Sequence, residues 1–462
     1  MHSHVIDSGF LRDLYGTEEL RQIFSDVHQL QCWLDFEAAL ARAEAGVGLA
    51  PPDAADEITR VARADLFDLE TIRQGVAETG HPLITIVREL AGLCGGEAGR
   101  YVHLGATTQD VTDTGLVLQV KAALPVIERD LQALAAALAG LARRERDTLM
   151  PGRTHGQHST PITFGYKVAV WLDEVRRHVV RLSQSSSRVL VGEFGGASGT
   201  LASVTRPGDR GVGGVDLAIE LRSRLMAELG LGVPDITWHA ARDRLAELVI
   251  VLAMIASTMG KIAHEVILLQ KSEVMELEEP FHMGKVGSST MPHKRNPMGC
   301  EGIMALARLA RALVPAMLES MGTAEHERDW AAVHTEWAAV PEAFILTGAA
   351  VSQTLDVARG LIVYREKMRS DVDILHGLIL SEAVMLKLGE TVGRQVAHDL
   401  VYEASMAAYE QGRPLKDLLL EDPRIAGRIS AEQLDEILRP EAYAGLAGEF
   451  VDQVTRWRSD AD

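Results

Sequence analysis

Apolar residues recur at helical spacing along most of the chain. Between Phe164 and Leu182 they follow one another at steps of three and four, which places them on one face of a long helix. Residues 243–276 show the same spacing but are apolar nearly all round in the middle, which is typical of a helix buried in a bundle or at a subunit interface. Further helices are predicted at residues 115–143, 302–320, 335–359 and 381–411.

Alternation of apolar and polar residues, the signature of a strand, is confined to short pieces such as residues 189–191. We therefore expect an all-α fold. Turn residues cluster around residues 95–101, and a polar stretch occupies residues 364–373. These breaks predict three helical domains, at residues 1–103, 104–360 and 361–462, and a length of 462 residues agrees with more than one domain.

Composition and charge narrow the class of protein. A net charge of −19 argues against a nucleic-acid binder, which would have to neutralise phosphates. Three widely spaced cysteines give neither a disulfide framework nor a zinc site, so a reducing cytoplasm fits best. The N-terminus lacks a secretory signal pattern, and the longest apolar run, residues 248–260, is too short to span a bilayer, so no membrane is expected.

The most informative segment is residues 287–297, which reads GSSTMPHKRNP. It combines two hydroxyls, Ser288 and Ser289, with an ammonium at Lys294 and an amide at Asn296. Glycine allows close approach of a ligand to the backbone, and consecutive amides in a turn can bind an anion. The alternative is a solvated loop rich in turn residues, which the density of reactive groups disfavours.

Two further segments carry polar groups at the start of predicted helices. Thr107 and Thr108 lie in a hydroxyl-rich stretch that could supply a helix N-cap, with Asp110 or Thr108 satisfying free helix amides, or could bind a carboxylate. Thr154 and His155 lie in a glycine-broken approach to the helix from residue 164. His155 is equally well explained as a structural residue or as a proton carrier with a pKa near neutrality.

The loop resembles the fingerprint G-S-S-x-M-P-x-K-x-N of the fumarase/aspartase superfamily and agrees with it at every fixed position. The resemblance implies that Ser288, with Ser289 less favoured, removes a proton next to a carboxylate. It implies that Thr107 and Thr108 bind a substrate carboxylate and that His155 acts as general acid. The implied fold has a central bundle of five long helices that assembles into a homotetramer with a twenty-helix core and shared active sites.

Other positions resemble substrate-binding or supporting residues of the adenylosuccinate lyases. The resemblance implies that Gln270 contacts the succinyl group, although a solvated helix cap is the alternative. Glu301 resembles a glutamate that supports the loop, and a solvated residue opening the next helix is an equal alternative. The remaining substrate-binding candidates are His81, Thr154 and Arg328.

The chain resembles two branches of the superfamily. Its ends resemble the 3-carboxy-cis,cis-muconate cycloisomerases and its middle the adenylosuccinate lyases. Leu14–Tyr15 stands where the latter have an arginine and tyrosine that hold a phosphate, and Val333 and Trp337 replace a phosphate-binding serine and arginine. Each lost charge-assisted contact weakens binding by roughly 1.5 to 3 kcal/mol, which disfavours a nucleotide substrate. The presence of His155, absent from many cycloisomerases, favours protonation of a separate leaving group.

We therefore predict a lyase that eliminates an amine or other nitrogen-containing group from a 2-substituted succinate and releases fumarate. The alternatives are cycloisomerase activity, with lactone formation, and an inactive structural homologue. Residues 192–199 lack the ending of a phosphate loop, and His264–Glu265 is not followed by the second histidine of a zinc protease. No metal or cofactor is expected. The expected partners are a small dicarboxylate and further copies of the chain.

Overall fold

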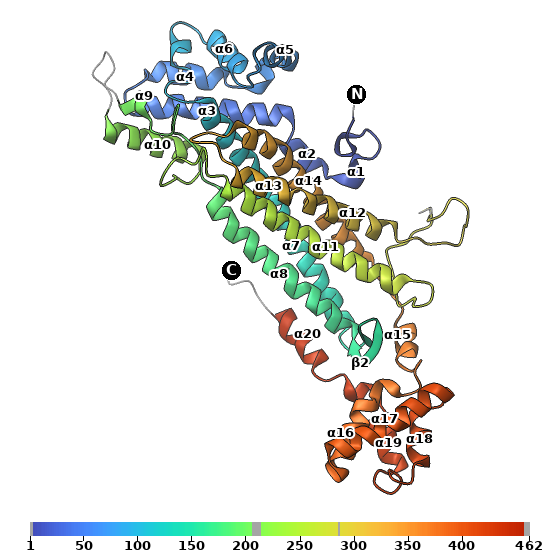
Figure 1. Ribbon diagram of the computed structural model, residues 1–462. Coiled ribbons are helices and arrows are strands. Elements are labelled where there is room, and N and C mark those ends of the chain that lie inside the picture. The colour runs from blue at the N-terminus through green and yellow to red at the C-terminus, as the bar shows by residue number, and fades with distance from the viewer. Residues whose placement is uncertain (1–2, 206–213, 285–286, 457–462) are drawn as a thin grey trace. The chain divides into compact units, whose positions relative to one another are not determined.

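A computed structural model describes residues 3–205, 214–284 and 287–456 and confirms the helical fold class (Figure 1). The chain divides into two compact units. The first comprises Met1–Leu131, His178–Gly260 and Ala305–Ser352, and the second Gln132–Arg177, Lys261–Met304 and Gln353–Asp462. The three domains expected along the sequence stay a prediction, because these units each combine separate stretches of chain.

Five long helices contribute residues to both units. They are α7 (Thr108–Arg144), α8 (Phe164–Val189), α11 (Asp243–Gln270), α12 (Met298–Ala312) and α14 (Trp330–Gly360). The predicted start of α8 at Phe164 is confirmed. Its apolar stripe is buried, with Val168, Leu172 and Val175 fully enclosed. The periodicity therefore identified the core-facing side of the helix.

Three of the predicted helices end earlier than periodicity suggested. One is shorter, and the other two are each split into two helices. The helix predicted to reach residue 276 ends at Gln270, because the following turn leads to Met275 with a φ of 49°. The prediction for residues 302–320 becomes α12 and α13 (Val314–Gly322). The prediction for residues 381–411 becomes α16 (Ser381–Val392) and α17 (Arg394–Gln411), separated by Gly393 at a φ of 84°.

The sequence did not reveal the main strands. Strands β1 (Leu149–Thr154) and β2 (Gln157–Thr163) form an antiparallel hairpin, and β3 (Leu277–Glu278) pairs with β4 (Ile362–Val363). The hairpin contains two prolines and a run of polar residues, so it shows no alternation. The short strand expected at residues 189–191 is wrong, since α8 continues to residue 189 and Val191 makes an isolated bridge with Gly232.

In the first unit, α3 (Asp26–Gly46) packs against α4 (Pro52–Val61) and α10 (Val215–Leu229), as Figure 1 shows. An ion pair of 2.9 Å between Arg42 Nε and Glu228 Oε2 joins α3 to α10. Besides α13, the other elements of this unit are η1 (Val5–Asp7), α1 (Arg12–Tyr15), α2 (Glu18–Ile23), η2 (Ala64–Leu66), α5 (Leu69–Thr79), α6 (Ile84–Leu93), η3 (Ala98–Tyr101) and α9 (Ala202–Thr205).

Helix α11 corrects one expectation and bears on another. By length and composition it could cross a membrane, so the argument that the apolar run is too short does not hold for the complete helix. However, 72% of its apolar window is buried inside the protein, as in the core helix of a bundle. Its middle is covered within one chain, with Leu252, Ile255 and Met259 enclosed and Met254 40% exposed. The apolar middle of α11 is therefore mostly covered within one chain, with Met254 left exposed.

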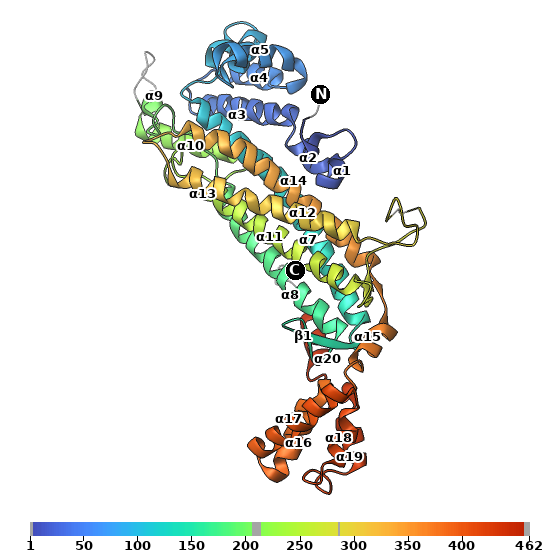
Figure 2. The same ribbon diagram turned by 45° about the vertical axis from the view of Figure 1, so that its right-hand side comes forward.

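In the second unit, the C-terminal helices enclose an apolar core of their own (Figure 2). Leu388 of α16, Leu400 of α17 and Leu415 of α18 (Leu415–Glu421) contribute to it, as does Leu434 of α19 (Ala431–Ile437). The remaining elements are α15 (Arg365–Val372), η4 (Leu378–Leu380), η5 (Pro440–Tyr443) and α20 (Ala447–Arg456). The polar stretch that suggested a boundary thus forms α15.

Candidate active site

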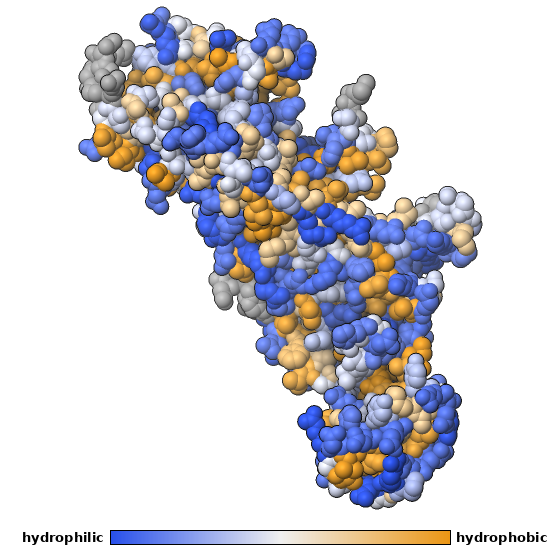
Figure 3. Space-filling view, in the orientation of Figure 1, coloured by the Kyte–Doolittle hydropathy of each residue, from blue (hydrophilic) through white to orange (hydrophobic). Residues whose placement is uncertain are grey.

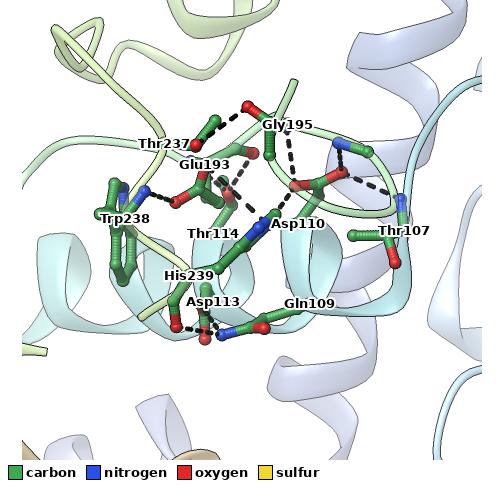
Figure 4. Close-up of polar contacts among 12 residues, drawn as sticks. Thr107, Gln109, Asp110, Asp113, Thr114, Glu193, Gly195, Thr237, Trp238 and His239 are labelled. Atoms are coloured by element: carbon green, nitrogen blue, oxygen red, sulfur yellow. Dashed lines mark hydrogen bonds and ion pairs between the residues drawn. The ribbon is translucent and has the colours of Figure 1, made fainter. Parts of the chain in front are cut away.

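Thr107 and Thr108 lie where the chain enters α7. The buried carboxylate of Asp110 fixes the position of Thr107 (Figure 4). Asp110 Oδ2 accepts a hydrogen bond of 2.9 Å from the amide of Thr107. The same carboxylate accepts bonds from the amides of Gly195 and Gly196, at 2.9 and 3.0 Å. Asp110 therefore differs from the expected N-cap, because it binds amides outside α7 and joins two loops.

His81 contacts the second threonine. His81 Nε2 lies 3.1 Å from Thr108 Oγ1, while His81 Nδ1 accepts from the amides of Leu83 and Ile84 at 3.3 and 3.1 Å. A nitrogen that accepts from two amides carries no proton, so the ring proton resides on Nε2 and is donated to Thr108. Burial and the nearby His103 lower the pKa of His81, which also favours the neutral ring. The Thr108 hydroxyl hydrogen consequently remains available for a ligand.

Arg328 reaches the same place from the residues that precede α14. Its Nε donates to Gln109 Oε1 at 2.9 Å, and its Nη2 donates to the carbonyl of Ala197 at 3.0 Å. Gln109 in turn donates to Asp113 Oδ2 and to the carbonyl of His239, at 3.0 and 2.9 Å. The first unit thus brings together four of the predicted substrate-binding residues: His81, Thr107, Thr108 and Arg328.

Sequence reasoning missed a buried group of titratable residues beneath these threonines. His239 Nε2 lies 2.8 Å from Asp110 Oδ1 and 4.0 Å from Glu193 Oε1. Burial alone would lower the pKa of His239, but the bond to Asp110 and the charge of Glu193 outweigh it and raise that pKa. Burial raises the pKa of Glu193 to about 8. The dense polar run of residues 107–114, ahead of the helix predicted from residue 115, was the available signal.

These three side chains have the donor types of a metal site, and their ligand atoms lie within 4.8 Å of one another. The carboxylate of Asp110 is already occupied. Oδ1 accepts from Gly195 and His239, and Oδ2 accepts from Gly196 and Thr107. Four donors use about four lone-pair positions of a carboxylate, so Asp110 has none left to offer a cation. The group is better described as a hydrogen-bonded support.

A second buried charged group lies beside the first. Arg242 donates to both oxygens of Asp113, at 2.6 and 2.9 Å, and to Glu336 Oε1 at 2.9 Å. All three side chains are enclosed, and the one positive charge of the arginine is shared between two carboxylates. Since Asp113 is on α7, Glu336 on α14 and Arg242 immediately before α11, this group fixes the ends of three helices.

In the second unit, His155 occupies the tip of the β1–β2 hairpin. Thr154 pairs with Gln157, which leaves His155 and Gly156 as a two-residue turn with φ values of 53° and 76°. Positive φ at both central positions is the geometry that suits the twist of a hairpin, and histidine tolerates it better than most residues. The turn presents both Thr154 and His155 to the exterior of the chain.

In the loop of residues 287–297, the backbone at Gly287 lies close to the backbone at Lys294 and Asn296. A Cβ atom on Gly287 would lie 2.5 Å from the carbonyl oxygen of Lys294 and 2.9 Å from the amide nitrogen of Asn296. Asn296 Nδ2 also donates to the Gly287 carbonyl at 2.5 Å. Gly287 is therefore needed for the approach of the loop's own backbone, which corrects the interpretation that it admits a ligand.

Ser288 is distinguished from Ser289 by its hydrogen bonds. Ser288 Oγ accepts from the amides of Met291 and Thr290, at 3.0 and 3.4 Å. Ser289 and Lys294 are exposed on the same loop. Hydrogen bonds donated to an oxygen favour its negatively charged form. The two amides directed at Ser288 Oγ thus distinguish it from Ser289, and its role as the base stays a prediction.

Gln270, at the end of α11, holds the loop in place. Its Nε2 donates to the carbonyl of Arg295 at 3.1 Å, and its Oε1 accepts from the amide of Glu279 at 2.9 Å. Glu279 caps α12 by accepting from the amides of Gly299 and Cys300, at 3.2 and 3.0 Å. Glu301 lies exposed in the first turn of α12. The free amides of α12 are thus partly used by the chain itself.

The predicted residues consequently form three groups. His81, Thr107, Thr108 and Arg328 lie together in the first unit. The loop residues Ser288, Ser289, Lys294 and Asn296, with Gln270 and Glu301, lie in the second unit, where Thr154 and His155 form a separate hairpin tip. Among the described residues, no hydrogen bond joins this tip to the loop. The assignment of all these residues to one site stays a prediction.

Comparison with known proteins places the chain in a family. Residues 15–311 match the family described as Lyase, and residues 377–454 match the family described as Adenylosuccinate lyase C-terminus. An N-acetyl-S-(2-succino)cysteine lyase from Dickeya dadantii (strain 3937) is 43% identical over 457 residues, covering 99% of this chain and 98% of the relative.

Two further similarities have nearly the same extent. A 3-carboxy-cis,cis-muconate cycloisomerase from Pseudomonas aeruginosa is 42% identical and covers 94% of this chain and 93% of the relative. The crystal structure of a fumarate lyase from Mesorhizobium sp. BNC1 superposes with a TM-score of 0.88 at 40% identity, covering 96% of this chain and 99% of that chain. The chain belongs to the fumarase/aspartase superfamily and is a lyase. The predicted reaction class, elimination from a 2-substituted succinate, is confirmed.

Proposed function

We propose that the chain cleaves the C–S bond of an S-(2-succino) thioether and releases fumarate and a thiol. The similarity to the N-acetyl-S-(2-succino)cysteine lyase over 99% of the chain supports sulfur as the leaving atom. The sequence had predicted a nitrogen-containing leaving group, and both atoms leave by the same β-elimination. A thiol and an amine can therefore be compared as nucleophiles in the reverse reaction with fumarate.

Ser288 is the proposed base, and the observation that carries this assignment is the pair of amides directed at its Oγ. Ser288 takes the proton from C3 of the succinyl group, and the electron pair passes into the adjacent carboxylate. Lys294 and the second amide hydrogen of Asn296 stabilise the charge that develops there. The C2–S bond then breaks as the C2=C3 bond of fumarate forms.

His155 is the proposed acid. It delivers a proton to the departing sulfur, which leaves as a thiol, and its exposed position on the hairpin tip allows it to reach a substrate. Thr107, Thr108 and Arg328 hold one carboxylate, with the Thr108 hydroxyl directed to the ligand because His81 supplies the other hydrogen bond of that oxygen. Gln270, Ser289 and Thr154 complete the proposed substrate contacts, and Glu301 supports the loop.

A nucleotide substrate is disfavoured by the surroundings of α14. Val333 is fully enclosed in the core and offers no hydroxyl. Trp337 stands in place of a phosphate-binding arginine. Its ring centroid lies 5.7 Å from that of Trp330 and 6.5 Å from that of Trp33. Aromatic faces suit an uncharged leaving group better than a phosphate.

We also propose a cytoplasmic homotetramer in which different subunits complete each site. Helix α7 separates Thr108 from the strand that leads to His155, and a helix of 37 residues has an axis ~55 Å long. Exposed apolar side chains on α8, α11, α12 and α13 offer a subunit interface. They are Val180, Met254, Leu309, Leu318 and Met321. Figure 3 shows apolar patches on one face of the molecule, interrupted by polar residues.

The reverse reaction tests the leaving group. The protein is incubated with fumarate and, in separate reactions, N-acetylcysteine, a primary amine or no nucleophile, and the products are identified by mass spectrometry. We expect the succinyl thioether to form with the thiol faster than without enzyme. Exclusive formation of the amine adduct would contradict sulfur as the leaving atom, and lactone formation from a carboxymuconate without any fumarate adduct would favour the cycloisomerase alternative.

A further inference from the structure

We propose that Asp110 and His239 act as a pair of positioning residues that set the geometry of the substrate-carboxylate site. This inference rests on the proposed function, because it assigns carboxylate binding to Thr107, Thr108 and Arg328. Neither Asp110 nor His239 touches the substrate in this proposal. They act through the two loops that they join (Figure 4).

The first observation is the number of backbone amides that converge on one buried carboxylate. Asp110 accepts from Thr107 on one loop and from Gly195 and Gly196 on another, with all three distances between 2.9 and 3.0 Å. Bonds from amides to an ionised acceptor are stronger than those between neutral groups. Replacing the carboxylate by an amide group would place donors against donors and separate the loops.

The second observation is that Arg328 is attached to both loops. Gln109, which binds Arg328 Nε, directly follows Thr108, and Ala197, whose carbonyl binds Arg328 Nη2, directly follows Gly196. A shift of either loop therefore moves one of the two anchors of the guanidinium. The spacing between the arginine and the threonine hydroxyls is set by the carboxylate that joins the loops.

The third observation concerns how His239 completes the pair. Its Nε2 supplies the fourth donor to Asp110 at 2.8 Å. Its ring lies against the glycine-rich loop, where a Cβ atom on Gly195 would be 3.2 Å from the imidazole Cε1. The imidazole Nδ1 is buried and has no hydrogen-bond partner. The bond from Nε2 to Asp110 is therefore the hydrogen bond through which this buried side chain acts.

Glutamine and leucine at position 239 separate the bond from the bulk of the ring. The His239→Gln variant keeps a donor near the place of Nε2, whereas His239→Leu fills a similar volume without a donor. Asp110→Asn removes the charge and substitutes two donor hydrogens for one acceptor oxygen. Glu193→Gln is the control for a change in a neighbouring buried carboxyl group, because Glu193 lies 4.0 Å from His239 Nε2 but accepts from none of the three amides bound by Asp110.

The variants are compared by steady-state kinetics with the succinyl thioether and by calorimetric binding of succinate, a dicarboxylate that cannot eliminate. We expect Asp110→Asn and His239→Leu to raise KM and the Kd for succinate by about 10-fold or more, the effect of one lost charge-assisted contact. We expect kcat to change less than about threefold, since contacts to the non-reacting carboxylate are made equally in the ground and transition states. His239→Gln should restore both constants to within about threefold of the wild type.

Each outcome decides the proposal. Unchanged Kd and KM in folded Asp110→Asn and His239→Leu would overturn it, as would equal losses in His239→Gln and His239→Leu. If the first two variants do not fold, an unchanged Kd in folded Asp110→Glu, whose longer side chain displaces the carboxylate, would overturn it instead. A wild-type protein that binds succinate but does not act on thioethers would contradict the proposed function while leaving the positioning pair supported by the binding data.

A double variant tests whether Asp110 acts through Arg328. Arg328→Ala should weaken succinate binding, and adding Asp110→Asn should weaken it further by a smaller factor than in the wild-type background, because one anchor of the positioned set is already gone. Equal factors in the two backgrounds would contradict action through the arginine.

Discussion

His81 Nε2 lies 3.1 Å from Thr108 Oγ1 and donates its hydrogen to that oxygen, because the other ring nitrogen accepts from two backbone amides. This relationship leaves Thr108 as a hydrogen-bond donor with one direction free. His81, predicted from the sequence to bind substrate, is thus placed to direct the hydroxyl of Thr108.

Substitution of Thr108 tests this direction. We expect Thr108→Val to raise the KM for the succinyl substrate about 10-fold, since a hydrogen bond to a charged group is lost, whereas Thr108→Ser retains the hydroxyl and should remain within about threefold of the wild type. Initial-rate measurements give both values. Similar KM values for the valine and serine variants would contradict a role for the hydroxyl.

The two serines of the loop form a matched pair. We expect Ser288→Ala to lower kcat by at least about 1000-fold, because the loop loses its proposed base, and Ser289→Ala to lower it less than about 10-fold, because its oxygen lacks the two amide donors. The exchange of the C3 proton with deuterated solvent, followed by NMR, reports the base step directly. A larger loss in Ser289→Ala would transfer the assignment to Ser289.

His155 should matter in proportion to the basicity of the leaving group. Asparagine tolerates the φ of 53° at this position, so His155→Asn preserves the hairpin turn while removing the acid. We expect the variant to lose about 100-fold in kcat with an alkyl thiolate leaving group and less than about 10-fold with an aryl thiolate, which leaves without a proton. A uniform loss over a series of thioethers would count against the acid role.

The buried carboxyl of Glu193 predicts a pH effect on stability. Its pKa is raised from 4.5 to about 8 by burial, so the folded protein holds a proton that the unfolded chain releases above pH 4.5. This stabilisation is present below pH 4.5 and is lost as pH rises to about 8, with a slope of roughly 1.4 kcal/mol per pH unit.

Glu193→Gln cannot ionise, so its free energy of unfolding should decline less between pH 5 and pH 8 than that of the wild type. Denaturant unfolding of both proteins at several pH values gives the two slopes. Parallel slopes would show that Glu193 has an ordinary pKa in the folded state.

The proposed sharing of sites between subunits predicts complementation. Ser288→Ala and His155→Asn proteins are separately impaired, but dissociation and reassociation of a mixture should restore part of the activity, because some sites receive both intact residues. Native mass spectrometry establishes that mixed tetramers have formed. Absence of recovery in verified mixed tetramers, or a fully active monomer, would rule out shared sites.

The linear order of residues was enough for the fold class, the family and the course of the long helices. Helical periodicity depends on neighbours three and four positions apart. The apolar stripe of α8 and its start at Phe164 can therefore be predicted from nearby residues in the sequence. The loop that carries Ser288 was identifiable for a similar reason, because its reactive groups are close in sequence. Short-range chemistry at the ends of helices was harder to foresee, as the breaks at Gly393 and after Gln270 show.

Tertiary structure decided what depends on residues far apart in the chain. Asp110 and His239 are separated by 129 positions in the sequence. Their role as a pair could not be predicted from the sequence, because only folding buries both side chains and brings them into contact. The β1–β2 hairpin is held by pairing between strands that have no alternating pattern of their own. The motif already favoured Ser288 over Ser289, but the hydrogen bonds that distinguish these two adjacent hydroxyls depend on three-dimensional structure, because the turn directs two amides at Ser288 Oγ.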